Sequence, residues 1–213
     1  MNSSTLRRTG GAAAAAVTLG LALTACGGND DSGTTGSAPS APMSSSMSSG
    51  GTSEAGAATF GPGCSSIPTS GSGSFDGMVK DPVATAASNN PLLSTLVSAV
   101  TKAGLVDTLN GADGLTVFAP TNDAFKKLPK ADLDKVMANK KLLTEILTHH
   151  VISGQLDPSS IDGTHTTLDK DQVTVSGDTG GMTVDGAKVL CGNLPTANAT
   201  VYVVDSVLMP KGM

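Results

Sequence analysis

The segment Thr116–Phe125 constrains the fold of this 213-residue chain more than any other stretch of its sequence. Its first half is apolar and β-branched, as in a buried strand, and Pro120 ends that strand because proline cannot donate to a sheet ladder. Thr121 or Asn122 can cap a helix that begins at once, because a short polar side chain accepts from the free amides of a first turn. We interpret Thr116, Phe118, Pro120, Thr121, Asn122 and Phe125 as the structural residues of this strand–helix motif.

The hydrophobic period changes along the rest of the chain. Before Gly154, apolar residues recur at helical spacing, as in Leu92–Val100 and in the stretch 140–150. After Gly154 the period falls to two, which is typical of strands, and Val184-Asp-Gly-Ala187 is a hairpin signal. This order predicts an α+β fold, an antiparallel β-sandwich or wedge covered by several short helices. The strands predicted in this second part are 164–168, 173–176, 182–184, 188–190 and 201–208.

Composition divides the chain into three regions. Residues 1–25 have a basic start and an apolar run too short for a membrane span, as in an export signal. They lead into Leu23-Thr-Ala-Cys26, the pattern at which bacterial lipoproteins are lipidated, so we expect a lipid on Cys26; the alternative is a plain secretory signal. Residues 26–74 are rich in Ser, Gly and Thr and predict a flexible linker, either glycosylated or bare. Residues 75–213 have the size of one folded domain.

Composition also excludes one class of partner. The chain has no tryptophan, one tyrosine and four phenylalanines, which is too few rings for a platform that stacks nucleic-acid bases. Its formal net charge is −5, and loss of residues 1–25 removes two of 13 basic and none of 18 acidic residues, which leaves −7. An acidic surface repels phosphate backbones, so we expect no nucleic-acid partner.

The three cysteines allow a simple pairing. If Cys26 carries lipid, Cys64 and Cys191 remain in an exported protein, where a disulfide is the default. Closing a loop of about 128 residues would stabilise the fold by ~4–5 kcal/mol in the chain-entropy model. The alternative is two free thiols. A metal site is not expected, because the CxxC and HExxH spacings do not occur.

Sequence motifs of catalysis are absent. The chain contains no GxSxG, no glycine-rich phosphate loop after a strand, and no repeated His, Asp or Glu spacing typical of metal ligands. We therefore expect a protein that is not an enzyme, with no catalytic residue, no metal and no cofactor.

Three segments, in order, resemble the signature regions of the fasciclin domain family. Thr116–Phe125 resembles the first motif of that family, and Ala199–Pro210 resembles the second, a strand that closes on proline. Leu147–Ile152 resembles the central segment, in which His149 stands in the place of the usual tyrosine. The resemblance covers about residues 81–210 and implies a single fasciclin-like domain.

Further segments are similar to the mycobacterial immunogenic surface antigens of that family, of which one is secreted and one is lipid-anchored. These segments are 81–91, the Gly61–Cys64 lead-in and 196–200, and the lipidation pattern at Cys26 resembles that of the anchored form. The same resemblance implies a disulfide between Cys64 and Cys191.

The resemblance implies an exposed adhesion or interaction module, since fasciclin domains of animal matrix proteins bind integrins and matrix components. Their functional residues lie around the second motif and the central segment, which correspond here to Asp205, His149 and His150. Two features differ: Leu194-Pro-Thr-Ala197 replaces the acidic lead-in of the integrin-binding members, and the central tyrosine is missing.

Each candidate residue also has a structural interpretation. His150 lies on the apolar face of its predicted helix and is expected to be a core histidine that bonds to the backbone. His149 is offset from it by about 100° and is expected to be the more exposed contact. Asp205 is either a buried acceptor for the first motif or an exposed contact. The segment Thr121–Asp123 either fastens the motif or touches a ligand.

Positive charge is concentrated in one helical stretch, which is either a solvated face or a dock for anionic glycans or lipid headgroups. We take Lys126 and Lys127 as candidate interaction residues. Asn198-Ala-Thr200 fits an N-glycosylation sequon, which we interpret as accidental in a bacterial chain. The lysines of the stretch are Lys126, Lys127, Lys130, Lys135, Lys140 and Lys141.

Together these observations predict a monomeric, exported protein that is lipid-anchored at the outer face of the cell membrane, is partly shed, and acts in adhesion. Its expected partners are the membrane, through the lipid, and a protein, glycan or matrix component of the host or the envelope. One alternative is a carrier of a small apolar envelope lipid, since few aromatic side chains can leave cavities. The other is an envelope hydrolase, which would need a pocket with a carboxylate beside His149.

Overall fold

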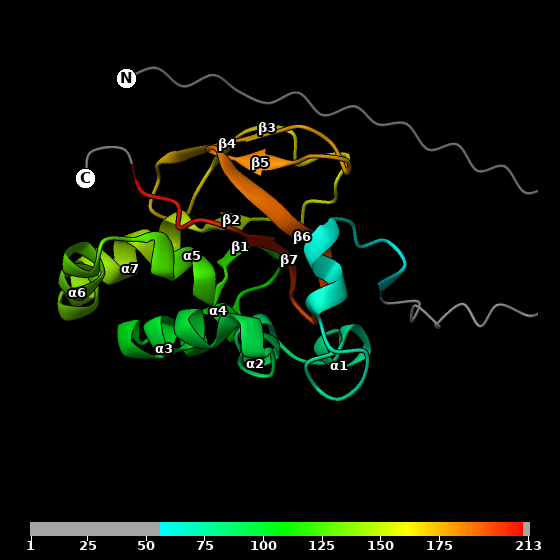
Figure 1. Ribbon diagram of the computed structural model, residues 1–213, viewed down its shortest axis with the longest axis horizontal. Helices are drawn as coiled ribbons and strands as arrows, with labels where there is room; N and C mark the ends of the chain where they lie inside the picture. The colour runs from blue at the N-terminus through cyan, green and yellow to red at the C-terminus, as the bar shows by residue number, and fades with distance from the viewer. Residues whose placement is uncertain (1–55, 211–213) are drawn as a thin grey trace, which may run out of the picture. The chain divides into compact units, whose positions relative to one another are not determined.

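The computed structural model describes residues 56–210 (Figure 1). Its helices are α1 (Phe75–Met78), α2 (Val83–Ser88), α3 (Ser94–Ala103), α4 (Val106–Gly111), α5 (Asn122–Lys127), α6 (Lys130–Ala138) and α7 (Lys140–His149), with the 3₁₀ helices η2 (Pro62–Ser66) and η3 (Pro91–Leu93). Its strands are β1 (Leu115–Pro120), β2 (Val151–Ser153), β3 (Gly163–Thr166), β4 (Gln172–Ser176), β5 (Thr183–Val184), β6 (Ala187–Pro195) and β7 (Ala199–Val204).

The strands form one mixed sheet in the order β2-β1-β7-β6-β5-β4-β3. Its centre is a parallel pair, β1 with β7, in register from Leu115↔Ala199 to Pro120↔Val204. The other neighbouring strands pair antiparallel. The predicted α+β class is confirmed, but the prediction of an antiparallel sheet is wrong for this central pair. The chain leaves β1 through three helices and five strands before it returns as β7, and such a long crossover permits parallel pairing.

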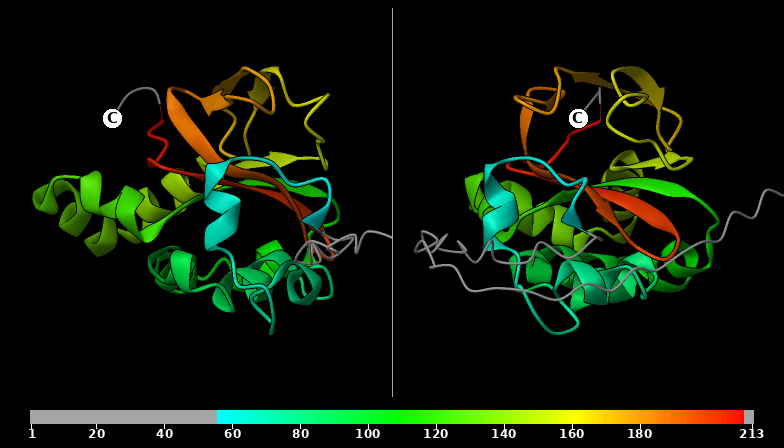
Figure 2. Two further views of the ribbon diagram at one scale, coloured as in Figure 1. Left: turned by 45° about the vertical axis from the view of Figure 1, so that its right-hand side comes forward. Right: turned by 90° about the vertical axis from the view of Figure 1, so that its right-hand side faces the viewer.

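The central strands lie between two layers (Figure 2), and a hydrophobic core fills each side of them. Helices α1–α4 cover one face of the central strands, and β3–β5 form a layer on the opposite face. Because side chains alternate along a strand, Val117 and Ala119 of β1 enter the helical core, whereas Phe118 enters the core between the two strand layers. A bridge between Ile152 and Thr167 joins the two ends of the sheet, so the sheet folds back on itself, as the predicted sandwich requires.

The β5–β6 turn is the hairpin that the Asp-Gly signal predicts. Val184 pairs with Ala187, and the two residues between them have positive φ, 45° at Asp185 and 83° at Gly186. This is the conformation that a two-residue turn with the right-handed strand twist needs. Of the predicted strands, 201–208 is shorter in the structure: β7 ends at Val204, and at Asp205 the side chain takes the place of the backbone carbonyl as acceptor for the amide of Lys188.

The described domain begins before the predicted boundary at Phe75. Residues 56–74 belong to the predicted linker, yet they contain η2, the buried Ile67 and one half of a disulfide between Cys64 and Cys191. The linker assignment is therefore wrong for 56–74, because covalent and backbone pairing to β6 compensates for the low apolar content of this stretch. The export signal, Cys26 and the linker up to residue 55 lie outside the described residues.

Candidate functional site

The parallel pairing of β1 and β7 brings the two signature motifs together. Both strands end at the same edge of the sheet, where the amide of Thr121 donates to O of Val204 at 3.2 Å. The first motif continues there as α5, and the second continues as Asp205. The residues that follow the two strands are therefore neighbours, although 78 positions separate Lys127 from Asp205 in the chain.

A cleft of about 290 Å³ lies at this meeting point, and we call it the motif cleft. One wall is α5, the second is the segment after β7, and the third is η2. The floor of the cleft is apolar and includes Leu190 and Val203. The residues that line the whole motif cleft are Gly63, Ser66, Leu92, Thr121, Asn122, Asp123, Lys126, Lys127, Leu190, Val203 and Asp205.

Two ion pairs occupy the rim of the motif cleft. Nζ of Lys127 lies 2.8 Å from Oδ2 of Asp205, and Nζ of Lys126 lies 2.8 Å from Oδ1 of Asp123. The lysine side chains are 55% and 75% exposed, respectively. Solvent-exposed pairs of this kind contribute little to stability. Their charges can therefore turn toward a ligand at small cost to the fold.

Asp205 is the most constrained charged group of the cleft. Its Oδ1 accepts from the amide of Lys188 at 2.8 Å and from Oγ of Ser206 at 3.1 Å, while Oδ2 accepts from Lys127. Burial raises the pKa of the Asp205 carboxyl, but the bonds from Lys127, the Lys188 amide and Ser206 outweigh burial and lower that pKa. Asp205 thus joins α5 to β6, and its side chain remains 23% exposed.

The polar residues of the first motif fasten elements together. Oγ1 of Thr121 accepts from the amide of Ala124 and caps α5. Oδ1 of Asn122 accepts from the amide of Thr95 at 2.9 Å, and its Nδ2 donates to O of Pro91 at 2.9 Å, which ties α5 to the start of α3. Oγ1 of Thr116 donates to O of Gly154 at 2.7 Å. The apolar members, Phe118 and Phe125, are buried in the two cores.

The prediction that His149 is an exposed contact is wrong. Its side chain is buried, and Nδ1 lies 3.0 Å from Oδ2 of Asp169. Asp169 in turn accepts from Oγ1 of Thr167 and from the amide of Asp171. This carboxylate stands beside His149, as the hydrolase alternative requires. The ring, however, is sealed, and its Nε2 has no hydrogen-bond partner among the described residues.

His150 has the structural position predicted for it. Its Nδ1 lies 2.7 Å from O of Ile146, and its Nε2 accepts from the amide of Leu208 at 2.9 Å. The neutral ring, with its proton on Nδ1, satisfies both bonds at once. Burial lowers the pKa of His150 to about 4. His150 therefore connects α7 to the C-terminal end of the second motif and is not a surface contact.

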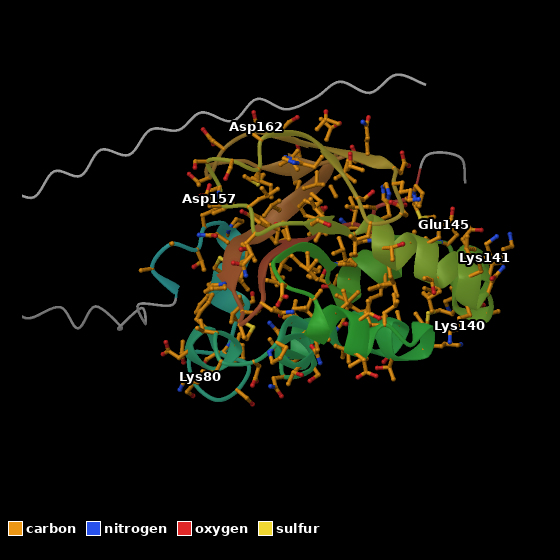
Figure 3. The ribbon with its side chains drawn as sticks, turned by 180° about the vertical axis from the view of Figure 1, so that it is seen from behind. Lys80, Lys140, Lys141, Glu145, Asp157 and Asp162 are labelled. Carbon is orange, nitrogen blue, oxygen red and sulfur yellow. A yellow bond between two sulfur atoms is a disulfide. The ribbon has the colours of Figure 1, made fainter. Side chains whose placement is uncertain are left out.

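The lysines of the basic stretch lie at separate places on the domain and do not form one basic surface. Lys126 and Lys127 line the motif cleft, and Lys135 pairs with Asp132 on α6. Lys140 and Lys141 lie at the start of α7, close to Glu145 of the same helix (Figure 3). There they line a separate open groove with Thr144, Thr148 and Asp169. The motif cleft is thus the one place where lysines from this stretch meet residues of both motifs among residues 56–210.

Sequence reasoning missed the third wall of the motif cleft, made by Gly63 and Ser66. These residues fall in the predicted linker, and only the pairing of Cys64 with Cys191 signals that they lie beside β6. The sequon at Asn198 is structural, because its Nδ2 donates to O of Leu109 and O of Ala112, both at 2.8 Å. A side-chain nitrogen held in this way is not free to accept a sugar.

A metal site, a membrane span and an internal ligand pocket each have requirements that can be compared with residues 56–210. No cluster of three or more His, Cys, Asp or Glu side chains in this range is arranged to hold a metal ion. None of the helices described here has the length and apolar content that crossing a membrane requires. Two apolar cavities under α2 and α3 measure about 40 and 30 Å³, whereas ligand pockets usually measure about 300–1,000 Å³.

Comparison with known proteins identifies the domain that carries this cleft. Residues 91–210, more than half of the chain, match the fasciclin domain. The chain belongs to the fasciclin domain family. Among solved structures, this fasciclin domain resembles a FAS1 domain pair from the insect cell adhesion molecule fasciclin I, with a TM-score of 0.52 and 16% identity, over 63% of this chain and 53% of that one. At that identity the similarity shows the fold alone.

Two curated relatives of this fasciclin domain are mycobacterial proteins. The cell surface glycolipoprotein MPT83 of Mycobacterium tuberculosis is 57% identical over 145 residues, which cover 66% of this chain and 66% of that protein, slightly less than two thirds of its length. The immunogenic protein MPB70 of Mycobacterium bovis is 51% identical over 159 residues, which cover 70% of this chain and 81% of that protein. The predicted resemblance to the fasciclin family and to these antigens is confirmed.

Proposed function

We propose that this fasciclin-domain protein is a cell-surface binding protein that engages a protein, glycan or matrix partner through the motif cleft. The observation that carries the proposal is the convergence of both family motifs on one cleft with solvent-exposed lysines at its rim. The relatives described as a cell surface glycolipoprotein and an immunogenic protein support a place on the cell surface.

The chemistry of the motif cleft favours recognition over catalysis. It offers ammonium groups from α5, carboxylates, a hydroxyl on Ser66 and an apolar floor that includes Leu190 and Val203. Such a mixture suits a polar chain with an apolar face, such as a glycan or an extended peptide. Asp205 and Lys127 would exchange their mutual bond for bonds to the ligand.

The cleft can be tested by photo-crosslinking on intact cells. We expect a photoreactive amino acid at Ser66, which is exposed and lines the cleft, to capture a partner that mass spectrometry identifies. The same amino acid at Gln172, exposed on β4, is the control and should capture much less.

A pair of charge reversals tests which lysines matter. Lys126→Glu with Lys127→Glu should lower partner capture several-fold, because both ammonium groups at the cleft rim are lost. Lys140→Glu with Lys141→Glu makes the same change in charge at the start of α7 and should leave capture unchanged. If only the second pair lowers capture, the motif cleft is the wrong site.

We also propose that Cys26 carries the lipid that holds this domain at the membrane. The support is the Leu-Thr-Ala-Cys pattern and the relation to a protein described as a glycolipoprotein. A single lipidated cysteine with two acyl chains gives stable attachment. Cells fed radiolabelled palmitate should label the protein, and Cys26→Ala should abolish the label; equal labelling of the two would contradict the anchor.

The lipid-carrier alternative gains no observation in its favour, and the hydrolase alternative gains one, the carboxylate of Asp169 beside a buried His149. A lipid carrier needs a larger cavity than the 40 and 30 Å³ spaces under the helices, so α2 and α3 would have to move apart. A bound lipid mass in native mass spectrometry would revive it. A hydrolase that uses His149 would need the ring to be exposed, whereas its side chain is 1% exposed.

A further inference from the structure

A strap formed by residues 58–67 crosses the edge of β6 and belongs to neither signature motif. Phe60 and Gly192 form a bridge in which each amide donates to the other's carbonyl, at 3.2 and 2.8 Å. Nδ2 of Asn193 donates to O of Ala58 at 3.1 Å. The Cys64–Cys191 disulfide, with its Cα atoms 4.8 Å apart, holds the far end. Backbone pairing and one covalent bond therefore attach the strap.

The strap covers an edge that the sheet leaves open. β6 has nine residues, but β5 pairs with it only at Ala187 and Lys188. Among the strands of residues 56–210, none pairs with this edge beyond that point, and Phe60 of the strap supplies the missing partner. An open strand edge accepts a segment from another chain as readily as one from its own, provided that the side chains fit.

The edge accepts only a narrow range of sequences. A Cβ atom on Gly61 would lie 2.4 Å from O of Leu190, and one on Gly63 would lie 2.9 Å from Cβ of Leu190. Gly61 also has a φ of 107°, which favours glycine. The ring of Phe60 occupies the space that a side chain at Gly192 would need. A segment that fits this edge needs an aromatic residue, a glycine, any residue, a second glycine and a cysteine, in that order. Phe60–Cys64 of the strap has this sequence.

The strap lies on the surface of the domain and is followed by an exposed loop. None of the five residues of η2 is buried, whereas Ile67 enters the helical core and the ring of Phe60 packs against Tyr202 with the ring centroids 6.3 Å apart. Within residues 56–210, the chain runs from the strap into the next element through the loop 68–73, where Thr69–Ser72 are exposed and Gly71 has a φ of 88°. Short, constrained hinge loops favour exchange of the segment that they connect. No threading of the chain through the fold is needed.

From these contacts we infer that the strap of one copy can occupy the β6 edge of a second copy, in a strand-exchanged dimer. Each copy then gives Phe60 and Cys64 to the Gly192 and Cys191 of the other, with the bonds that it makes in the monomer. Because Gly63 and Ser66 line the motif cleft, each cleft of the dimer is built from both copies.

The covalent step balances without an oxidant or a reductant. A small thiol, as its thiolate, attacks the Cys64–Cys191 bond and forms a mixed disulfide with one cysteine, which frees the other as a thiolate. This thiolate attacks the Cys64–Cys191 bond of the second copy and forms the first intermolecular disulfide, which frees the second copy's other cysteine as a thiolate. As the straps exchange, that thiolate attacks the mixed disulfide, forms the second intermolecular disulfide and releases the small thiol. Two intramolecular disulfides thereby become two intermolecular ones, and the thiol acts only as a catalyst.

Isotope mixing measures the exchange directly. The chain without residues 1–25, with Cys26→Ser, is made in ¹⁴N and ¹⁵N forms, mixed equally at high concentration with glutathione, and alkylated. After digestion without reduction, we expect Cys64–Cys191 peptide pairs of hybrid isotope mass, rising toward one half of the total, the statistical limit. They should come from a dimer that size-exclusion chromatography separates and that keeps the circular dichroism of the monomer.

Two results would overturn the inference. In the first, glutathione adducts show that the disulfide opens, but no hybrid pairs form. In the second, hybrid pairs form only in unfolded material. Deletion of Thr69 and Ser70 in the hinge should raise the dimer fraction several-fold, whereas deletion of Ser159 and Ser160 in the exposed loop before β3 should not. Since no ligand takes part, these outcomes are independent of whether the motif cleft binds a partner.

Discussion

At the scale of single residues, His149 and His150 are neighbours in the chain, are both buried, and have different surroundings. His149 faces the carboxylate of Asp169 in the β3–β4 turn, whereas His150 bonds to two backbone groups, O of Ile146 and the amide of Leu208. The sequence places both on α7, and the helical offset between them predicts one exposed ring. The β3–β4 turn covers that ring, because Asp169 and Thr167 pack over it.

The pH dependence of stability should report on His150. Its pKa falls from 6.5 to about 4 on folding, because burial and the Leu208 amide both disfavour a proton on Nε2. A depressed histidine pKa means that the unfolded chain binds the proton first. The stabilisation from the neutral ring is therefore complete above pH 6.5 and is lost as pH falls from there through about 4.

The shift corresponds to a loss of roughly 3 kcal/mol in the free energy of unfolding across that window. His149 and Asp169 interact electrostatically with His150, so the comparison must isolate the His150 ring. Urea denaturation at several pH values should give a shallower decline for His150→Asn than for the natural chain. Parallel declines for the two proteins would show that His150 does not carry the effect.

At the scale of elements, the first motif folds locally and is joined to its surroundings by a few side chains. The end of β1 and the start of α5 follow from Pro120 and Thr121 alone, which is why the sequence predicts them. Asn122 adds a contact that no local rule predicts: its side chain caps the first turn of α3 from another element. This bond determines where α3 lies against α5.

Asn122→Ala should lower the free energy of unfolding by about 1–2 kcal/mol, because the amide of Thr95 and O of Pro91 lose their partner. Chemical denaturation provides the measurement. Ser98→Ala is the matched control, since Oγ of Ser98 bonds to O of Ser94 within one exposed helical turn and should cost under about 0.5 kcal/mol. Equal losses in the two variants would exclude the proposed tie between α3 and α5.

At the scale of the whole molecule, the Cys64–Cys191 disulfide connects the first described segment to the penultimate strand. The sequence separation of 127 residues makes it a closure of nearly the entire domain. It also holds the strap against β6, and the strap forms one wall of the motif cleft. One covalent bond thus links the stability of the domain to the shape of its candidate site.

Replacement of both cysteines, Cys64→Ala with Cys191→Ala, should lower the free energy of unfolding by up to ~4–5 kcal/mol, because the unfolded chain regains the entropy of an open loop. Urea denaturation of the variant and of the natural chain, with and without reductant, gives the difference. Reductant should destabilise the natural chain and leave the variant unchanged. An unchanged midpoint for the natural chain under full reduction would contradict this role.

Much of this fold could be predicted because its signals are short in range. The Asp185-Gly186 hairpin, the Thr121 cap and the apolar stripe of α7 each depend on a few adjacent residues. The parallel pairing of β1 with β7 depends on segments about 80 residues apart, and no local pattern distinguishes it from an antiparallel neighbour. The prediction of the sheet fails at this long-range pair.

The sequence by itself determined the strand–proline–helix form of Thr116–Phe125, the α+β order of elements and the pairing of two cysteines, because each depends on local chemistry or on simple counting. Only the tertiary structure decided that His149 is sealed, that residues 56–74 belong to the domain, and that Lys127 meets Asp205 in one cleft. The physical reason is that burial and ion pairing depend on which distant segments pack together, and that choice is made by the two cores on either side of the sheet.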